Sequence, residues 1–491
     1  MKQVQLSGRS EIVTGAYRLF VVAYSMTLPF QMAVACLVVR SEARETMSRV
    51  RLLGANAATM PKARTTQGID SLFRDVKFAD SIRPKDLRLL DTILVNRPPG
   101  NRVEEQVLPH RISDADVKRY VFINASALAP AGDQQLRRSV TLNISPGRTF
   151  RATISRRYTS LEKATIWEGT VDRPAAGGPA SVTLVQVDSV LSGAIRIADT
   201  IFTIRHYGNR IHEIERVRQS GFDPERPPRP PRSEADGRGF DRAPLETCAP
   251  QVVDVLVVVT PFVLDSLKGY SAVVAQAELA TRETNAALTY SGVEHQVRLA
   301  GVMVTQYRGE GNIDADLDRI QNVADDFMDE VITSRRTLKA DVVSLWVEST
   351  NAGVPACGLG NLITAPQVGR DRAFFVVRRN CAVGYFSFGH ELGHLLGSNH
   401  DRSNAALVAA LPYAFGYTDP SGRFRDIMSY KCGSSCPRLQ FFSTTAASGE
   451  LLNHPLIQGR PLGIAYETDS ANAANVAQAV KFTMCYASKY Y

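Results

Sequence analysis

Residues His390–Asp401 read HELGHLLGSNHD. His390 and His394 stand four positions apart, which is about one helical turn, so both imidazoles would project from one face of a helix toward a single ion. Glu391 follows directly, where a carboxylate reaches a water on that ion rather than the ion itself, as a general base must. The stretch therefore predicts a helix that carries two metal ligands and a base.

The second half of the stretch supplies a turn and a third ligand. Gly397 comes three residues after His394, where the helix must end, and glycine adopts the left-handed conformation of such turns at little cost. The reversed chain would bring His400 to the ion from another side. Three neutral imidazoles leave a fourth position open, as in catalytic rather than structural zinc sites.

An amphipathic helix that carries histidines by chance is the simplest alternative. Six specified residue types in one frame arise by accident in a chain of this length on the order of once in a million sequences. The alternative that stays open is a degenerate site that binds zinc without turning over a substrate.

A second motif follows at Asp426–Tyr430, which reads DIMSY. The pattern HExxHxxGxxHD followed by a methionine turn resembles the metzincin clan of zinc endopeptidases. The resemblance implies that Met428 forms an apolar floor beneath the metal. It also implies that Tyr430 reaches the zinc or the transition-state oxyanion, although this ring could simply pack on the wall of the site. Asp401 matches the reprolysin and ADAM-like pattern, which implies a structural acid that hydrogen-bonds nearby backbone.

The resemblance extends from Cys248 to the end of the chain. It is strongest to bacterial reprolysin-like enzymes, the peptidyl-Asp metalloendopeptidase group among them, through Val252-Asp254-Val255, Cys357–Leu359 and Tyr385–Phe388. A serralysin is disfavoured because the sequence lacks glycine-aspartate nonapeptide repeats. The implied activity is zinc-dependent hydrolysis of protein or peptide substrates. The loop after Met428 would shape substrate preference, and we expect its Arg438 to be exposed, although the peptidyl-Asp likeness would have it bind acidic side chains.

Apolar and polar periodicity predicts an α/β fold of the zincin (α+β) kind for residues 248–491. Strands and helices alternate as βαβαβ, which builds a twisted, mostly parallel sheet backed by helices. The expected segments are strands at Val252–Val259, Val297–Val304 and Asp341–Val347 and helices at Ala272–Leu288 and Ile313–Ile332. Ala373–Val377 would be one more strand, and the resemblance makes it the antiparallel edge that pairs with an extended substrate.

The first 40 residues have the pattern of an export signal. Three basic residues precede an apolar stretch, Leu19–Val39, and Ala33–Ala35 offers a small-residue cleavage site. The apolar stretch is also long enough for an uncleaved membrane anchor. Cys36 faintly suggests a lipoprotein site. We expect a secreted protein, with a periplasmic or membrane-anchored form before processing and no stable membrane association afterwards.

Between the leader and the catalytic region lie two further segments. Residues 41–217 contain strand-like runs with period-two alternation, such as Ser139–Ile144, Ser181–Val185 and Thr200–Ile204, and predict a small β-rich domain. Its place suggests a propeptide that masks the cleft as an intramolecular inhibitor. Residues 218–247 form a linker rich in proline and arginine, which should stay extended and open to cleavage. A permanent spacer is the alternative.

Cysteine use points to an oxidising compartment, because six of the seven cysteines fall in the catalytic region. Six cysteines permit 15 pairings. Our preferred set is Cys357 with Cys381, Cys432 with Cys436, and Cys248 with Cys485. A competing use of Cys248 is a thiolate latency switch on the zinc.

Net charge and motif content exclude few functions for this chain. The net charge of +8 is spread along the chain rather than clustered, apart from the arginine-rich linker, and no nucleic-acid-binding motif is present. The sequence therefore predicts a secreted zinc metalloendopeptidase made as a zymogen. Two alternatives stay open: a zinc-holding adhesion or interaction module with vestigial activity, and an amidase that acts on non-protein amides.

Overall fold

The computed structural model describes most of the chain from residue 71 onward. The described residues are 13–14, 17–18, 71–75, 118–124, 127–128, 138–145, 148–172, 179–231, 248–322, 324–348, 353–405, 408–433, 436–447 and 449–491. Residues Thr66–Tyr491 form one compact unit. The predicted leader lies outside the described residues, apart from the two-residue strands β1 (Val13–Thr14) and β2 (Tyr17–Arg18). Within the described part, no helix combines the length and apolarity needed to cross a membrane.

The C-terminal half is built on a five-stranded sheet with the order β13-β12-β14-β16-β15. All neighbours pair in parallel except the edge strand β15, which is antiparallel to β16. The strands are β12 (Val252–Val259), β13 (Gln296–Val304), β14 (Val342–Val347), β15 (Gly358–Gly360) and β16 (Phe374–Arg378). The mostly parallel sheet agrees with the βαβαβ pattern.

The predicted identity of the edge strand was wrong. Strand β16, expected at the edge, is bonded on both sides, and the shorter β15 lies outside it. Two of the three residues of β15 are glycines, so this strand has no alternation of apolar and polar residues, and it was not predicted from the sequence.

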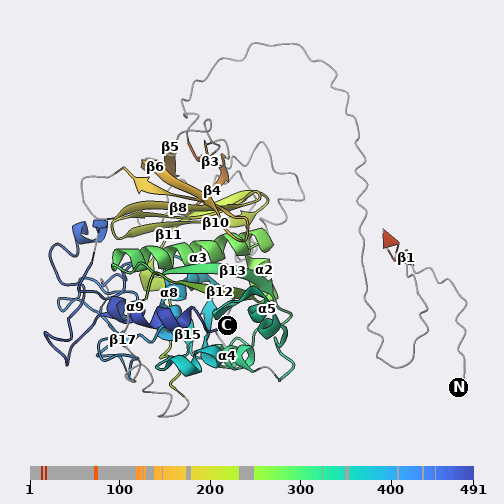
Figure 1. Ribbon diagram of the computed structural model, residues 1–491. Coiled ribbons are helices and arrows are strands. Elements are labelled where there is room, and N and C mark those ends of the chain that lie inside the picture. Colours follow the sequence, from red (N-terminus) through yellow and green to blue (C-terminus); the bar gives the residue numbers. More distant parts are fainter. Residues whose placement is uncertain are drawn as a thin grey trace, which may run out of the picture. The chain divides into compact units, whose positions relative to one another are not determined.

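Helices cover both faces of this sheet (Figure 1). Helix α3 is close to its predicted bounds, but the single helix expected at 313–332 is two helices separated by a turn. The turn forms because Asp326 and Met328 take positive φ and the Asp325 side chain accepts a hydrogen bond from the Phe327 N–H, so the acid competes with helical bonding. The helices are α2 (Pro261–Ser266), α3 (Tyr270–Tyr290), α4 (Ile313–Gln321), α5 (Glu330–Leu338), α6 (Gly369–Arg372), α7 (Arg379–Ala382), α8 (Ser387–Leu395) and α9 (Val476–Ala487).

A nine-stranded antiparallel sheet precedes this half and contains the predicted β-rich runs. Its order is β3-β4-β11-β10-β9-β8-β7-β6-β5. The sheet curls back on itself, because the Leu72 N–H beside β3 donates to the Thr141 carbonyl of β5 at 2.9 Å. The strands are β3 (Phe73–Asp75), β4 (Lys118–Ile123), β5 (Arg138–Ser145), β6 (Arg148–Thr159), β7 (Thr165–Val171), β8 (Ala180–Val187), β9 (Val190–Ile197), β10 (Thr200–Gly208) and β11 (Ile211–Arg216).

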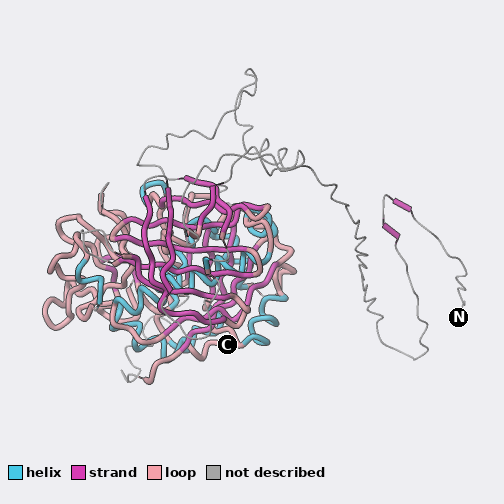
Figure 2. Tube along the Cα trace, turned by 90° about the horizontal axis from the view of Figure 1, so that it is seen from above, coloured by secondary structure: helices cyan, strands magenta, loops and turns pink. Residues whose placement is uncertain are grey.

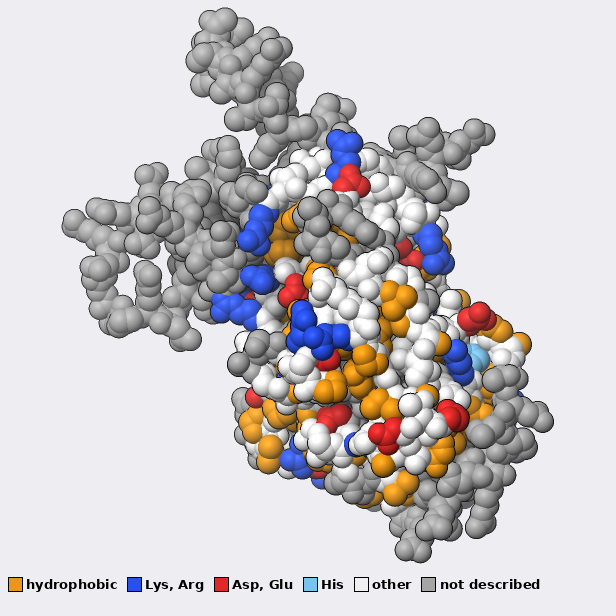
Figure 3. All heavy atoms as spheres, turned by 90° about the vertical axis from the view of Figure 1, so that its left-hand side faces the viewer, with side chains coloured by type: hydrophobic (Ala, Val, Ile, Leu, Met, Phe, Trp, Pro, Cys, Tyr) orange, Lys and Arg blue, Asp and Glu red, His pale blue; other side chains and the backbone are white. Residues whose placement is uncertain are grey.

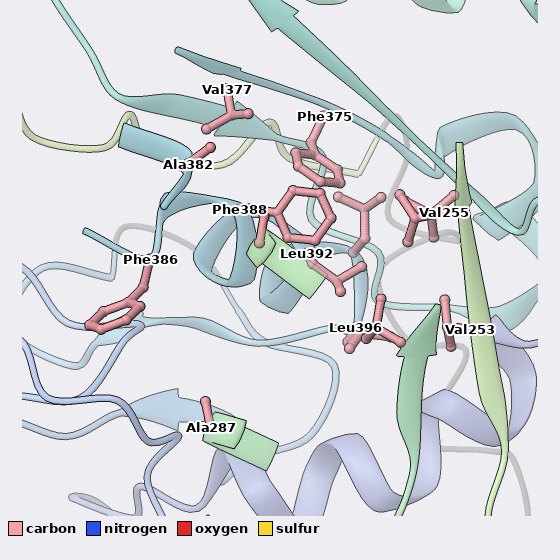
Figure 4. Packing of buried hydrophobic residues seen from close by; sticks show 14 of the residues in the cluster. Val253, Val255, Ala287, Phe375, Val377, Ala382, Phe386, Phe388, Leu392 and Leu396 are labelled. Carbon is pink, nitrogen blue, oxygen red and sulfur yellow. The ribbon is translucent and has the colours of Figure 1, made fainter. Parts of the chain in front are cut away.

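Helix α3 lies between the two sheets and is buried along most of its length. Its alanine-rich sequence keeps side chains small, so that both sheets approach it closely. Seen from above, the strands of the curled sheet lie over the helices (Figure 2). One apolar cluster runs from Ile166 and Val185 of the curled sheet through α3 to Val255 of β12. The same cluster includes Phe388, Leu392 and Leu396, which anchor α8 against β12 and β16 (Figure 4).

Three disulfides join the predicted pairs: Cys248–Cys485, Cys357–Cys381 and Cys432–Cys436. The first ties the start of β12 to α9. Because Cys248 is bonded to Cys485, the thiolate latency switch is contradicted. On the face shown in Figure 3, positive and negative side chains are interspersed among neutral surface, in line with the spread net charge.

Candidate active site

Three imidazoles meet at the C-terminal end of α8. His390 and His394 lie on the helix, and His400 lies on β17 (Asn399–Asp401), a short strand paired with β18 (Phe415–Gly416). Their Nε2 atoms stand 3.1 to 3.2 Å from one another. The three atoms therefore face a common point, as the spacing predicted.

The donor set fits a tetrahedral cation. The Nδ1 atoms of His390 and His394 each lie 2.8 Å from a backbone carbonyl, of Ile427 and Ser398. A carbonyl only accepts, so these Nδ1 atoms carry the proton, and the Nε2 lone pairs face one another. Ligands at zinc–nitrogen distances of about 2.0–2.1 Å stand roughly 3.3 Å apart, close to the observed separation. Lone pairs at this distance repel unless a cation lies between them.

Burial keeps all three rings neutral. Removal from water lowers the pKa of His394 to about 4 and lowers the pKa values of His390 and His400 well below the usual range, with neighbouring imidazoles adding to the shift in the latter two. A neutral imidazole is the form that binds a metal, so the site requires no deprotonation near neutral pH.

Glu391 lies beside the histidines with its side chain fully buried. Burial first, and then the nearby Glu225 carboxylate, raise the pKa of Glu391 well above its usual value. The carboxylate packs against β15: a Cβ on Gly358 would stand 2.3 Å from Glu391 Oε1, and one on Gly360 would stand 3.1 Å from Oε2. The two glycines of the edge strand therefore make the room that this carboxylate occupies.

The turn and the methionine lie where the sequence placed them. Gly397 has φ +83°, and a Cβ there would come within 2.4 Å of the Ala410 Cβ, so glycine is required. The Met428 sulfur lies 2.4 Å from where a Cβ on Gly393 would stand. Met428 thus packs directly under the helix that carries the first two histidines.

Asp401 and Tyr430 are linked to each other. One Asp401 oxygen accepts a hydrogen bond from the Tyr430 backbone N–H at 3.0 Å, so the acid bridges β17 to the methionine turn. The Tyr430 ring lies 4.0 Å from the His400 ring, centroid to centroid. Its hydroxyl donates to the Glu225 carbonyl at 2.9 Å. Tyr430 therefore contacts a peptide carbonyl beside the three histidines.

Comparisons with known proteins agree with this geometry. A reprolysin-type family model, described as Metallo-peptidase family M12, matches residues 249–443. A peptidyl-Asp metalloendopeptidase of Stenotrophomonas maltophilia (strain R551-3) is 34% identical over 301 residues, which are 59% of this chain and 67% of that protein. Another, from Xanthomonas campestris pv. campestris, is 30% identical over 366 residues, which are 71% of this chain and 81% of that protein.

The chain belongs to this reprolysin-like metallopeptidase family. Its enzyme class is that of a metalloendopeptidase. Metalloproteinase-II from Bacteroides fragilis aligns over 65% of this chain and 90% of that chain at 11% identity, with a TM-score of 0.40.

The metalloendopeptidase has a second group of charged residues beside the histidines, of which the sequence analysis had singled out only Arg438. Arg438, expected to be exposed, is 2% exposed. Its Nη1 donates to Glu225 Oε1 at 2.7 Å and to the Tyr385 carbonyl at 3.0 Å, and its guanidinium lies 4.4 Å from the Tyr385 ring centroid. Ser387 Oγ also donates to Glu225 Oε1, at 2.8 Å. The prediction of an exposed arginine was wrong, because Glu225 comes from the linker and no local pattern connects it to residue 438.

Burial pulls the pKa of Arg438 down, but Tyr385 and Glu225 outweigh this effect and leave it raised. The guanidinium is therefore charged. Arg438 and Ser387 bind the Glu225 carboxylate, and Tyr385 contacts Arg438. We call these three residues, Arg438, Tyr385 and Ser387, the acid-binding site.

Proposed function

We propose that this protein is a secreted, zinc-dependent endopeptidase, made as a zymogen, that cuts peptide bonds beside acidic side chains. The observation that carries the proposal is the meeting of three Nε2 lone pairs next to a buried carboxylate. His390, His394 and His400 would hold the ion. When bound, zinc polarises a peptide carbonyl and lowers the pKa of a coordinated water.

The side chains around the ion would carry the proton and orient the peptide. Glu391 takes a proton from the attacking water and gives it to the leaving amine. The Tyr430 hydroxyl, which donates to a carbonyl in this structure, would donate to the oxygen that gains charge during attack. Gly397, Asp401 and Met428 would act only by holding these groups in place.

A preference for acidic side chains follows from the acid-binding site. A buried guanidinium needs a carboxylate partner, and a neutral side chain of the same size would leave it unpaired. The names of the two relatives, peptidyl-Asp metalloendopeptidases, agree with that chemistry. In this structure Arg438 and Ser387 bind the Glu225 carboxylate, which belongs to the linker of the same chain, and this contact supports the proposed preference.

The domain plan completes the proposal. Residues 1–40 would direct export, residues 41–217 would form the propeptide, and residues 218–247 would be the segment where it is cut to release 248–491. Three disulfides in the catalytic half suit an oxidising compartment.

The test uses the full chain expressed with export, cut within the linker, and incubated with casein. We expect hydrolysis that a chelator abolishes and that one equivalent of Zn²⁺ restores, with one zinc per chain by elemental analysis. Hydrolysis that persists after the zinc has been removed would refute the proposal, and so would a folded, processed and zinc-loaded protein without any activity.

A further inference from the structure

We propose that residues Asp223–Pro231, here called the inhibitory strand, act as a built-in competitor of the substrate, and that the Glu225–Arg438 ion pair is the contact that makes the competition effective. The inference rests on the proposed endopeptidase function and deepens it, because it says which contact keeps the enzyme latent. Latency would then depend on filling the acid-binding site rather than on a thiolate at the metal.

The inhibitory strand extends the catalytic sheet by one strand at its edge. The Arg226 N–H donates to the Gly358 carbonyl at 3.0 Å, and the Arg229 N–H donates to the Gly360 carbonyl at 2.9 Å. The Pro224 and Arg229 carbonyls accept from the backbone N–H groups of Cys357 and Leu362 at 3.0 and 2.8 Å. Residue numbers rise together, so the inhibitory strand runs parallel to β15. An extended substrate could not pair with the same edge.

Prolines prepare the strand for this position. The sequence of the inhibitory strand is DPERPPRPP. The backbone N–H groups of its two arginines donate hydrogen bonds to β15, whereas the prolines, which have no N–H, lie at positions that donate no hydrogen bond to β15. Proline also fixes φ near the extended region, which reduces the conformational entropy that the strand loses on docking.

The first ionic contact is buried. The Glu225 side chain is 0% exposed and the Arg438 side chain 1% exposed. The Glu225 backbone carbonyl accepts a hydrogen bond from the Tyr430 hydroxyl. Glu225 therefore fills the acid-binding site with its side chain and occupies the position proposed for the reacting carbonyl with its backbone. Removing the carboxylate would leave a buried, unpaired guanidinium, which weakens docking strongly.

The second ionic contact is at the surface of α4. Arg226 Nη2 lies 3.0 Å from Asp314 Oδ2, and Arg229 contacts Asp318 and the Asp314 carbonyl. Asp314 and Asp318 are 43% and 69% exposed, so solvent screens these pairs. They steer the strand to the edge but contribute less than the buried pair.

Further contacts lead the chain into the site. The Phe222 ring stacks on Tyr385 with centroids 4.5 Å apart. Asp223 Oδ2 lies 2.7 Å from an Arg378 nitrogen. The inhibitory strand is therefore the continuation of a docked chain and not an isolated contact.

The experiment compares the intact full chain with two variants, Glu225→Gln and the matched control Glu215→Gln, which changes a glutamate on β11 away from the site. We expect Glu225→Gln to raise casein hydrolysis by the intact chain at least about tenfold, and to speed hydrogen exchange of the Arg226 and Arg229 amides, because the buried pair is lost. The control should leave both unchanged. The variant Arg226→Gln/Arg229→Gln should raise hydrolysis only about two- to fourfold, with less effect at high salt.

A synthetic nonapeptide DPERPPRPP gives a second measurement that needs no folded variant. Added to the processed enzyme, it should inhibit competitively, and the same peptide with glutamine in place of Glu225 should bind about a hundredfold more weakly. Equal inhibition by both peptides, or unchanged amide exchange in the Glu225→Gln chain, would overturn the proposal. Amide exchange does not depend on catalysis, so the two failures can be told apart. Faster exchange in the intact Glu225→Gln chain together with no activity after processing would refute the proposed function, whereas unchanged exchange in a chain that is active after processing would refute this inference alone.

Discussion

The metal side and the acid-binding side of the active site are encoded in different ways. The metal side is formed by one continuous stretch, His390–Asp401, and by Met428, which packs against the helix in that stretch. The acid-binding side joins Arg438 to Tyr385 and Ser387, and in this structure to Glu225, more than 200 residues earlier in the chain. The first can be recognised from spacing alone, because helix geometry fixes where its side chains point. The second exists only once the fold has brought distant segments together.

The largest expected effect is on the metal side. Glu391→Gln should lower kcat by about 10³- to 10⁴-fold, because the amide cannot accept the proton, while the three histidines still hold zinc. The measurement is casein hydrolysis by the processed enzyme, together with the zinc content per chain. The matched control is Glu294→Gln, at an exposed position. An active Glu391→Gln enzyme would show that the base is elsewhere.

The metal side also shows how far the sequence can carry a structural prediction. Histidine spacing, the turn at Gly397 and the methionine below the helix are local features, and the structure has them where they were expected. The parallel pairing of β13, β12, β14 and β16 could likewise be predicted from the sequence, because apolar strands alternate with helices.

The acid-binding side shows where such prediction stops. Strand β15 has only three residues, two of them glycine, so no periodic pattern marks it. Arginine is usually exposed, and the burial of Arg438 depends on a carboxylate from the linker, Glu225. What the sequence lacked was the pairing of the inhibitory strand with β15, which is a tertiary contact without a local signal.

Arg438→Gln should give the next largest effect and separate the two sides directly. We expect kcat/KM for a peptide with aspartate at the cleavage site to fall about a hundredfold, because the substrate carboxylate loses its charged partner. The same peptide with asparagine should be cut at nearly the same low rate by both enzymes. Zinc content should not change. A preserved preference for aspartate in the variant would place acid recognition on another residue.

Tyr430→Phe tests a residue that belongs to both sides, since its ring packs on His400 and its hydroxyl meets the Glu225 carbonyl. Loss of one donor to the developing oxyanion should lower kcat by about ten- to a hundredfold with little change in KM. Measurement of both constants on one peptide distinguishes the roles. If kcat is unchanged and only thermal stability falls, the tyrosine serves for packing.

The smallest effect on catalysis should come from the substitution Glu283→Gln, because Glu283 contacts the backbone next to Tyr385 and lies outside the acid-binding site itself. Its carboxylate on α3 accepts the Gly384 N–H at 2.8 Å, one residue before Tyr385, and lies 3.8 Å from Arg196 of β9. Burial raises the pKa of Glu283 from its usual 4.5 to about 7, against the lowering effect of Arg196. The folded protein therefore binds this proton more tightly than the unfolded chain does.

The sign of the pH dependence follows from that difference. The stabilising contribution of protonated Glu283 is fully present below about pH 4.5 and is lost as the pH rises to about 7, by at most about 3 kcal/mol. Asp341 and Asp426, whose pKa values burial also raises to about 7, act in the same direction. Glu283→Gln should reduce the fall in denaturation midpoint between pH 5 and 7 without changing the rate per folded molecule. An identical pH profile in the variant would mean that Arg196 keeps Glu283 ionised over this pH range.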